Sequence, residues 1–500
     1  MTRLRNNVFA NFAGQAWAAM IGLVFLPIYI RFLGIEAYGM VGFFLSLQAF
    51  FAILDFGLSA TINRELARRL QAGRAADEIR DLVRTLEWVY WPLGLLVAGL
   101  TLLASGPIAT HWLNPVDLGR EDLAQAIALM GVAAALQWPT GFYVGGFSGI
   151  ERQVLLNALN ACFATLRAAG AALVLWLWSP TLEAFLLWQV AVAALQTLVF
   201  HHVFWRLLPA GSRPAKASGS LLREVHAFAL GMTAILALSF LLMQSDRIIL
   251  SKLLPLDEFG YYTVAAAVAA ALARVIHPFF SALYPRYCAL VASGERDRLI
   301  DLYHHSNQLL AVVVCSVAAM LVFFAADILR LWTGDPLLAA KSGPVLALLA
   351  LGTALNGLMN LPYALQLAYG WTRLAIQQNI VAVLLVIPGT WWLARHYGMT
   401  GAAIMWVALN LAYVLISIPL MHRRLLPREM ARWYKFDVLP AALTAGVTAG
   451  CARIFIAPLP RTLSGLLLLA GTASLVVMAS ATATAVLRSK RSRVPESIQS

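Results

Sequence analysis

One uninterrupted apolar stretch near the end of the chain, residues 462–487, reads TLSGLLLLAGTASLVVMASATATAVL. It holds no Asp, Glu, Lys or Arg and exceeds the roughly 20 apolar residues that a helix needs to cross a bilayer. Charge-free stretches of similar or greater length lie at 88–116, 123–150 and 342–372. They do not alternate polar and apolar side chains as the strands of a membrane barrel do. The pattern therefore predicts an all-α polytopic membrane protein.

The composition of the whole chain agrees with that prediction. Of its 500 residues, 61% are hydrophobic and 12% charged, about half the charged fraction of an ordinary soluble domain. The net charge of +13 would suggest nucleic acid as a partner of a soluble protein, but here we attribute it to short basic loops and expect no nucleic-acid partner. The four cysteines all fall in apolar stretches without metal-type spacing, so we expect no disulfide, metal or cofactor site.

Apolar blocks and the residues that interrupt them predict fourteen membrane spans. They are expected near residues 8–30, 38–61, 86–108, 124–147, 155–178, 184–205, 228–251, 260–290, 307–327, 343–366, 374–394, 399–420, 437–457 and 463–487. Lysine and arginine in the connecting loops predict the orientation, because these residues accumulate on the cytoplasmic side. By this division 26 of the 37 Lys and Arg lie on one side and seven on the other, which predicts that both termini are cytoplasmic.

The sequence also contains a weak internal repeat with an offset near 220 residues. RFLGIEAYGMV, starting at Arg31, matches KLLPLDEFGYY, starting at Lys252, and pairs Gly39 with Gly260. An even number of spans in each repeat gives both halves the same orientation, which is a known plan for transporters that work by alternating access. We predict two six-helix lobes and an added helix pair. Their bounds are 1–210 for the N-terminal lobe, 211–430 for the C-terminal lobe, 431–487 for the helix pair and 488–500 for a cytoplasmic basic tail.

Charged side chains inside the predicted spans need a reason, because each costs about 2.5–3.5 kcal/mol at mid-bilayer by insertion scales. In the span 260–290, Arg274, His277, Ser281 and Tyr284 follow helical spacing and form one polar stripe. We expect Arg274 to line a hydrated cationic cavity between the halves. His277 is either a packed hydrogen-bond donor or a proton carrier.

Two further arginines, Arg167 and Arg247, are predicted to line the same cavity, since guanidinium forks hold phosphate oxygens bidentately. The alternative is structural, because polar side chains also join membrane helices through hydrogen bonds worth about 0.6 kcal/mol on average. For Arg247, an ion pair with the adjacent Asp246 is a further alternative. Asp55 and Asp246 are candidates for proton or Na⁺ coupling, or for neutralising a nearby arginine.

Two basic runs lie in the predicted cytoplasmic loops, RELARRLQAGR at 64–74 and HRRLLPREMARWYK at 422–435. We interpret them as topology determinants and interfacial helices that touch anionic lipid headgroups. A dedicated role in binding a lipid substrate is the alternative.

Several segments resemble the polysaccharide transporter, or oligosaccharide flippase, family. It belongs to the multidrug/oligosaccharidyl-lipid/polysaccharide exporter superfamily, together with the multidrug and toxin extruders and the lipid II flippases. The segments are FLPIYIRFLGIEAYGMVGFF at 25–44, LDFGLSATINREL at 54–66, QSDRIILSKLLPLDEFGYYTVA at 244–265 and YGMTGAAIMWV at 397–407. The resemblance spans roughly residues 1–425.

The resemblance implies two six-helix lobes around a cationic cavity and the translocation of an undecaprenyl-diphosphate-linked oligosaccharide. By position, Asp55 and Arg64 fall in the family's second-helix motif, and Asp246 and Arg247 in its seventh-helix motif. The implied partners are a lipid-linked glycan, membrane lipids and polysaccharide assembly enzymes, and we expect a monomer in the bacterial inner membrane. Many members have only twelve helices, so the pair at 437–487 is an addition.

Two other functions are alternatives to glycan transport. An ion-coupled multidrug antiporter of the same superfamily should favour acidic residues for cationic drugs, whereas these spans carry more arginine than carboxylate. An integral-membrane glycan polymerase or ligase tends to carry a large catalytic loop, and no outer loop of that size is predicted here. We therefore expect a transporter and not an enzyme.

Overall fold

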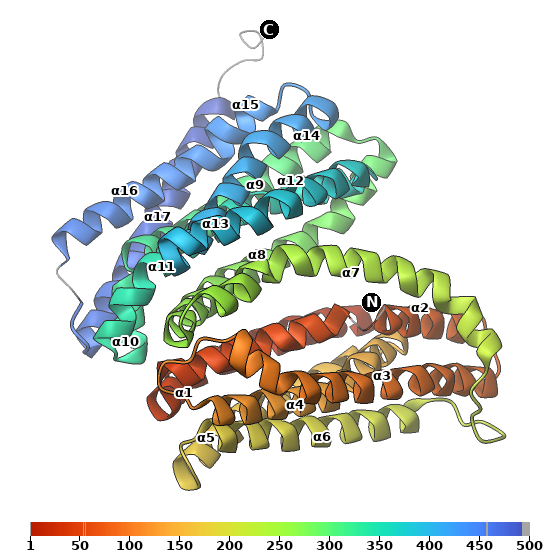
Figure 1. Cartoon of the computed structure of the whole chain (residues 1–500). Coiled ribbons are helices and arrows are strands. Elements are labelled where there is room, and N and C mark those ends of the chain that lie inside the picture. The colour runs from red at the N-terminus through yellow and green to blue at the C-terminus, as the bar shows by residue number, and fades with distance from the viewer. Residues whose placement is uncertain (1, 54, 56, 457–458, 493–500) are drawn as a thin grey trace. The chain divides into compact units, whose positions relative to one another are not determined.

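The computed structural model describes residues 2–53, 55, 57–456 and 459–492, with the backbone alone for 2–12, 52–53, 224–239 and 488–492. The side chains of the predicted basic tail lie outside the described residues. In the described part every regular element is a helix, which confirms the predicted all-α polytopic membrane fold. Figure 1 shows these helices along the whole chain.

The helices divide into two compact units, one ending at Gly260 and the other beginning at Tyr261. The first unit contains α1 (Thr2–Ile53), α2 (Leu58–Gln71), α3 (Ala76–His111), α4 (Arg120–Gly149), α5 (Gln153–Leu177), α6 (Leu182–Leu207), α7 (Gly219–Leu253) and the start of α8 (Leu256–Ser293). Helix α7 joins this unit because it packs against α1, α2 and α3. The lobe boundary that we predicted at 210 and 211 comes from the repeat and stays a prediction.

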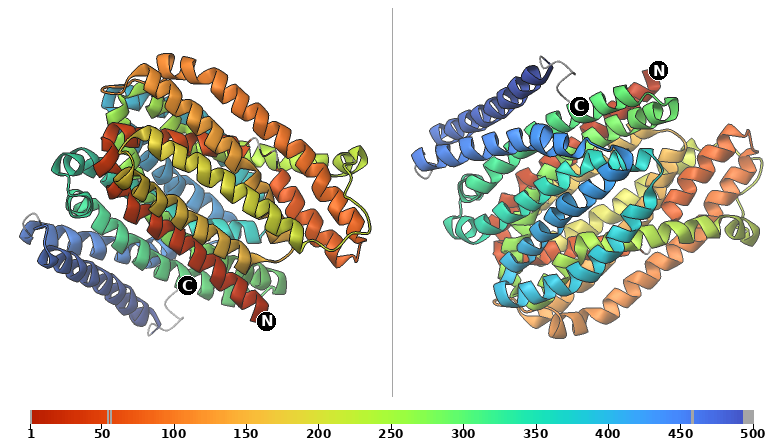
Figure 2. Two further views of the ribbon diagram at one scale, coloured as in Figure 1. Left: turned by 90° about the horizontal axis from the view of Figure 1, so that it is seen from below. Right: turned by 90° about the horizontal axis from the view of Figure 1, so that it is seen from above.

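The second unit contains the rest of α8 and the C-terminal helices. These are α9 (Arg296–Phe323), α10 (Ala325–Thr333), α11 (Pro336–Leu358), α12 (Asn360–Ala368), α13 (Thr372–Ala412), the π-helix η1 (Tyr413–Ser417), α14 (Ile418–Leu425), α15 (Met430–Arg432), the π-helix η2 (Trp433–Val438), α16 (Leu439–Phe455) and α17 (Leu463–Ser492). Helix α9 lies at the centre and packs against α11, α16 and α17. Helices α16 and α17 lie side by side (Figure 2), so the added pair is part of this unit's core.

Eleven helical segments among the described residues are long and apolar enough to cross a membrane. Two of them contain two predicted spans each, because α1 is broken at Gly34 and α13 at Gly398. Both glycines have a positive φ, of 82° and 58°, a conformation that glycine adopts without the steric penalty of a Cβ. The predicted span 228–251 corresponds to α7, whose side chains are only partly described.

A glycine groove on α4 holds α2 close to it. A Cβ on Gly145 would lie 2.2 Å from the carbonyl oxygen of Ser59, and one on Gly149 would lie 2.7 Å from that of Asn63. Small residues four apart let membrane helices approach to backbone contact. This contact positions the start of α2. The predicted site residue Asp55 lies in the turn just before that helix.

Replacing Gly145 by alanine is expected to destabilise the first unit by about 1–3 kcal/mol, since the methyl group would overpack the α2 contact. Gly99→Ala is the matched control, because Gly99 also lies inside a helix, α3, with nothing within 4 Å of its added Cβ. That substitution should leave the melting temperature in detergent unchanged or raise it, since alanine reduces the freedom of the unfolded chain. Equal melting temperatures for both variants would contradict the close contact.

The two glycines paired by the repeat contact each other's helices reciprocally within the first unit. A Cβ on Gly39 would lie 2.4 Å from the carbonyl oxygen of Leu256, and one on Gly260 would lie 2.3 Å from that of Ile35. Ile35 and Leu256 are themselves separated by the repeat offset of 221 residues. Each glycine thus packs against the residue that corresponds, in the other repeat, to the residue packed against its partner. Such a reciprocal contact is expected between symmetry-related segments.

Candidate functional site

Asp55 is a buried carboxylate in the turn between α1 and α2, with an exposed fraction of 8%. It accepts hydrogen bonds from the hydroxyl group of Tyr90, from the hydroxyl group of Ser59 at 2.7 Å and from the backbone N–H of Ser59 at 3.2 Å. No Lys or Arg of the described residues lies within ion-pair distance of it. Asp55 is therefore held by neutral donors, and no positively charged side chain among the described residues compensates its charge.

Arg167 lies half-buried on α5 and is held by glutamines. Its guanidinium group donates to Gln137 at 2.9 Å, to Gln196 at 2.8 Å and more weakly to Gln189 at 3.4 Å. Gln48 donates to the same oxygen of Gln137 at 2.9 Å. Within the described residues no carboxylate forms an ion pair with Arg167, so this part of the first unit contains a fixed cation whose partners are neutral.

The sequence did not single out Gln137, Gln189 or Gln196 as partners of Arg167. Gln189 and Gln196 are separated by seven residues on α6, two helical turns, so they share a face that sequence spacing could have identified. Both are buried. Buried amides at that spacing indicate a polar seam, but the sequence alone does not say which helix they face.

The other predicted residues of the first unit lie on α2 and α7. Arg247 is half-buried and donates no hydrogen bond to a described residue, and it forms no ion pair with Asp246, which is also half-buried. Successive residues of a helix point about 100° apart, which separates the two side chains. Arg64 is exposed on α2.

Arg274, His277 and Ser281 are exposed on α8 in the second unit. Ser281 donates a hydrogen bond to the carbonyl oxygen of His277 at 3.3 Å, and Arg274 donates none to a described residue. Tyr284, one turn further along, is half-buried and stacks on Phe280 with ring centroids 5.4 Å apart. The polar stripe thus occupies one accessible face of α8, and its contact with a substrate stays a prediction.

A buried carboxylate that we did not predict, Glu87, lies at the centre of a polar cluster in the first unit. It accepts hydrogen bonds from Tyr143 at 2.8 Å and Trp205 at 2.7 Å, and its other oxygen lies 3.1 Å from Arg84. His201 lies 3.2 Å from Glu87. The cluster joins α3, α4 and α6. In the sequence, only the spacing of three residues between Arg84 and Glu87 indicates this cluster.

A second unpredicted cluster joins α9 to the added helix pair in the second unit. His304 is buried between two carboxylates, with one ring nitrogen on Asp437 and the other 2.8 Å from Glu429. A neutral imidazole has a single N–H, so two donated bonds to ionised carboxylates require the charged ring. The bond from His304, opposed by partial burial, lowers the pKa of Glu429 to about 2.

Among the described residues, no group of three or more His, Cys, Asp or Glu side chains could hold a metal ion. The first unit instead contains two charges of opposite sign, Arg167 and Asp55, that form no ion pair with any described residue. A guanidinium group with only neutral partners can bind an anion without displacing a carboxylate. A buried carboxylate with only neutral partners can bind a proton or a small cation.

Comparisons with known proteins agree with the all-helical membrane fold. The family described as polysaccharide biosynthesis protein matches residues 4–291. The putative O-antigen transporter of Shigella flexneri is 22% identical over 414 residues, which cover 81% of this chain and 94% of that protein.

Two solved structures are similar across most of their length. The lipid II flippase MurJ in an inward closed conformation aligns with a TM-score of 0.68 over 95% of this chain and 98% of that one, at 11% identity. An inward-facing multidrug resistance MATE family transporter aligns with a TM-score of 0.65 over 84% of this chain and 96% of that one, at 14% identity. At these identities the similarity shows that the fold is shared.

Proposed function

Because the chain belongs to the polysaccharide biosynthesis protein family, we propose that it flips an undecaprenyl-diphosphate-linked oligosaccharide, a precursor of polysaccharide or O-antigen. The substrate would move from the cytoplasmic to the outer leaflet of the bacterial inner membrane by alternating access. The named relatives are transporters and flippases and not enzymes, and this chain is a multi-pass membrane transporter. We infer cytoplasmic termini from the loop charges.

The observation that carries this proposal is the environment of Arg167. A guanidinium group held by three glutamines is oriented and keeps its charge available, because no carboxylate of the described residues neutralises it. A diphosphate group fits such a site, since guanidinium groups bind phosphate oxygens through paired, charge-assisted hydrogen bonds. Burial strengthens the attraction by lowering the local dielectric constant.

Arg247 and Arg274 are proposed to contribute further charge to the diphosphate during the transport cycle. Neither donates a hydrogen bond to a described residue, so each guanidinium group retains its hydrogen-bonding capacity for a ligand. Arg64 and His277 are exposed and are proposed as additional substrate contacts. The polyprenyl tail would stay in the surrounding lipid.

Asp55 is the proposed coupling residue, and it also favours the second candidate function, an ion-coupled small-molecule antiporter. Asn in its place keeps the size, and its single oxygen can still accept from the hydroxyl groups of Tyr90 and Ser59, but it cannot bind a proton. We expect Asp55→Asn protein to fold with an unchanged melting temperature and to lose at least about tenfold in export driven by an ion gradient. Normal, gradient-dependent export by this variant would contradict a coupling role for Asp55.

Depletion of the protein followed by leaflet-resolved lipid analysis tests the proposed function. We expect a diphosphate-linked glycan to accumulate in the cytoplasmic leaflet, because synthesis continues while export stops. Altered drug resistance without such accumulation would overturn the proposal in favour of the antiporter. Membrane lipids and polysaccharide assembly enzymes are the proposed partners, and the protein is proposed to act as a monomer.

A further inference from the structure

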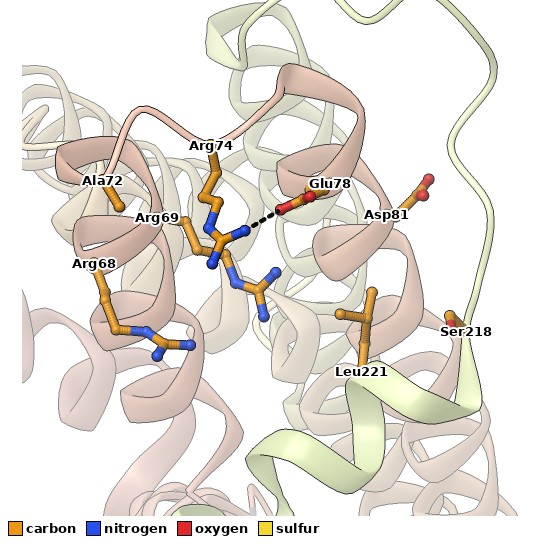
Figure 3. Close-up of a pocket in the computed structure, with 8 residues that line it drawn as sticks. All are labelled: Arg68, Arg69, Ala72, Arg74, Glu78, Asp81, Ser218 and Leu221. Atoms are coloured by element: carbon orange, nitrogen blue, oxygen red, sulfur yellow. Dashed lines mark ion pairs between the residues drawn. The ribbon is translucent and has the colours of Figure 1, made fainter.

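A pocket of about 450 Å³ opens at the end of the first unit where α2 turns into α3. Three guanidinium groups, those of Arg68, Arg69 and Arg74, face it from α2 and the following turn, and Leu221 of α7 faces it from the opposite side (Figure 3). Its three arginines belong to the basic run 64–74, and the proposed glycan transport assigns none of these three a contact with the substrate. Its lining belongs entirely to one unit.

The ion pairs around the pocket leave it with positive charge. Arg68 and Arg69 share the carboxylate of Glu65, at 2.6 Å and 3.5 Å. Asp81, which also lines the pocket, is bound by Arg213 at 2.5 Å and by the backbone N–H of Lys216 at 2.7 Å. This engagement of Asp81 outside the pocket reduces its ability to neutralise the three arginines.

Arg74 is the cation most available to a ligand. Its guanidinium group lies 3.9 Å from Glu78, and it donates no hydrogen bond within the described part of the chain. Both side chains are largely exposed, at 62% for Arg74 and 48% for Glu78. An exposed pair at this distance contributes little, typically about 0–1 kcal/mol, so an anion of higher charge density can replace Glu78 as the partner.

The N-terminus of α7 adds a second attraction for anions on the opposite side. Ser218 is the N-cap residue and lines the pocket, but its hydroxyl group pairs with Ser220 and does not cap the helix. The first N–H groups of a helix have no partner inside the helix and carry partial positive charge. Together with three guanidinium groups they form the donor set that phosphate groups prefer.

We propose that this pocket binds the phosphate group of an anionic membrane lipid. The arginines and the α7 N-terminus would hold the phosphate oxygens, and Leu221 would contact the apolar part next to the headgroup. The basic run is expected at the membrane surface, where a lipid phosphate can reach it. This binding is separate from the carriage of the glycan substrate, because it uses none of the residues assigned to that substrate.

Binding of short-chain lipids to the purified full chain in neutral detergent tests the proposal. Dioctanoyl phosphatidylglycerol, dioctanoyl phosphatidylcholine and inorganic phosphate are titrated by isothermal calorimetry. We expect phosphatidylglycerol to bind at least about tenfold more tightly than either of the others, since it combines net negative charge with apolar chains. The double variant Arg68→Gln, Arg74→Gln should reduce that preference to about twofold or less.

Two further variants make the result specific. Arg298→Gln is the matched control, because Arg298 also pairs with a glutamate three residues earlier, Glu295, and lies outside the pocket; it should keep the full preference. Ala72→Glu adds a carboxylate to the pocket wall while keeping every arginine, and it should abolish the preference. Retention of the preference in the double variant, or its absence in the wild type, would overturn the proposal. Inorganic phosphate binding as tightly as phosphatidylglycerol would overturn the assignment to a lipid.

Discussion

Arg167→Ala protein is expected to reach the membrane and fold but to export glycan at least about thirtyfold more slowly than the wild type. In the proposed mechanism Arg167 forms a charge pair with the substrate diphosphate. Removing one partner of a buried, hydrogen-bonded charge pair costs about 2–5 kcal/mol or more, and each 1.4 kcal/mol is a factor of ten. The glutamines around Arg167 would remain, but the site would lack the positive charge that binds the diphosphate. Export is measured as surface glycan in cells that contain the variant as the sole copy.

Arg167→Lys separates charge from geometry. Lysine keeps the positive charge but offers a point charge in place of a planar fork, so it cannot bind two phosphate oxygens in parallel. It also cannot reach Gln137 and Gln196 in the same geometry. We expect an intermediate loss of export, and full activity of this variant would show that charge alone is sufficient.

Gln196→Glu distinguishes a substrate contact from a structural role for Arg167. The oxygen of Gln196 lies 2.8 Å from the guanidinium group, so a carboxylate there would form an ion pair and neutralise the cation in place. If Arg167 binds the diphosphate, this variant should be at least as stable as the wild type and lose export. If Arg167 only joins α5 to α6, the variant should be stable and export normally, which would contradict the assignment.

His304→Ala is expected to destabilise the second unit strongly. Asp437 is fully buried, and without the imidazolium group its charge and that of Glu429 would lack their shared partner. Breaking a buried charge pair by removing one member costs about 3–5 kcal/mol. For a unit of this size, that should lower the melting temperature in detergent by on the order of 10 °C.

The control for that prediction is His396→Ala. His396 is exposed on α13 and hydrogen-bonds only the carbonyl oxygen of Trp392 among the described residues, so its removal should change stability by less than about 0.5 kcal/mol. In a His304→Ala background, Asp437→Asn should restore part of the lost stability, because it removes the uncompensated charge. Equal melting temperatures of the two histidine variants would contradict the proposed link between α9 and the added helix pair.

Most of the fold could be predicted because membrane spans are specified by local composition. The charge-free blocks identify the spans, and the breaks inside α1 and α13 occur at Gly34 and Gly398, where the sequence separates two predicted spans. The packing of α16 and α17 on α9 could not be predicted, since it depends on contacts between residues more than a hundred positions apart. His304 and Asp437 are an example, because neither stands out in its own segment.

The polar sites were predicted only in part, for a related reason. Helical spacing identifies which residues share a face of one helix, as for Arg274 and His277, but not which helix faces it. Arg167 stands out in the sequence by its charge, whereas its partners on α4 and α6 are uncharged and do not. Glu87 lies at the edge of an apolar block, and a carboxylate at such a position is usually interpreted as the end of a loop. Only the structure shows that its partners, Tyr143 and Trp205, hold it in a buried cluster.

The most direct test of the proposed transport function is flipping by the purified protein in liposomes. A fluorescent diphosphate-linked oligosaccharide on a polyprenyl chain is incorporated into both leaflets, and its outer-leaflet fraction is followed with a membrane-impermeant quencher. We predict that wild-type protein makes the inner-leaflet lipid accessible to the quencher and that Arg167→Ala protein does so at least about thirtyfold more slowly. Equal rates for wild-type, Arg167→Ala and protein-free liposomes would contradict the claim that this chain is a lipid-linked glycan flippase.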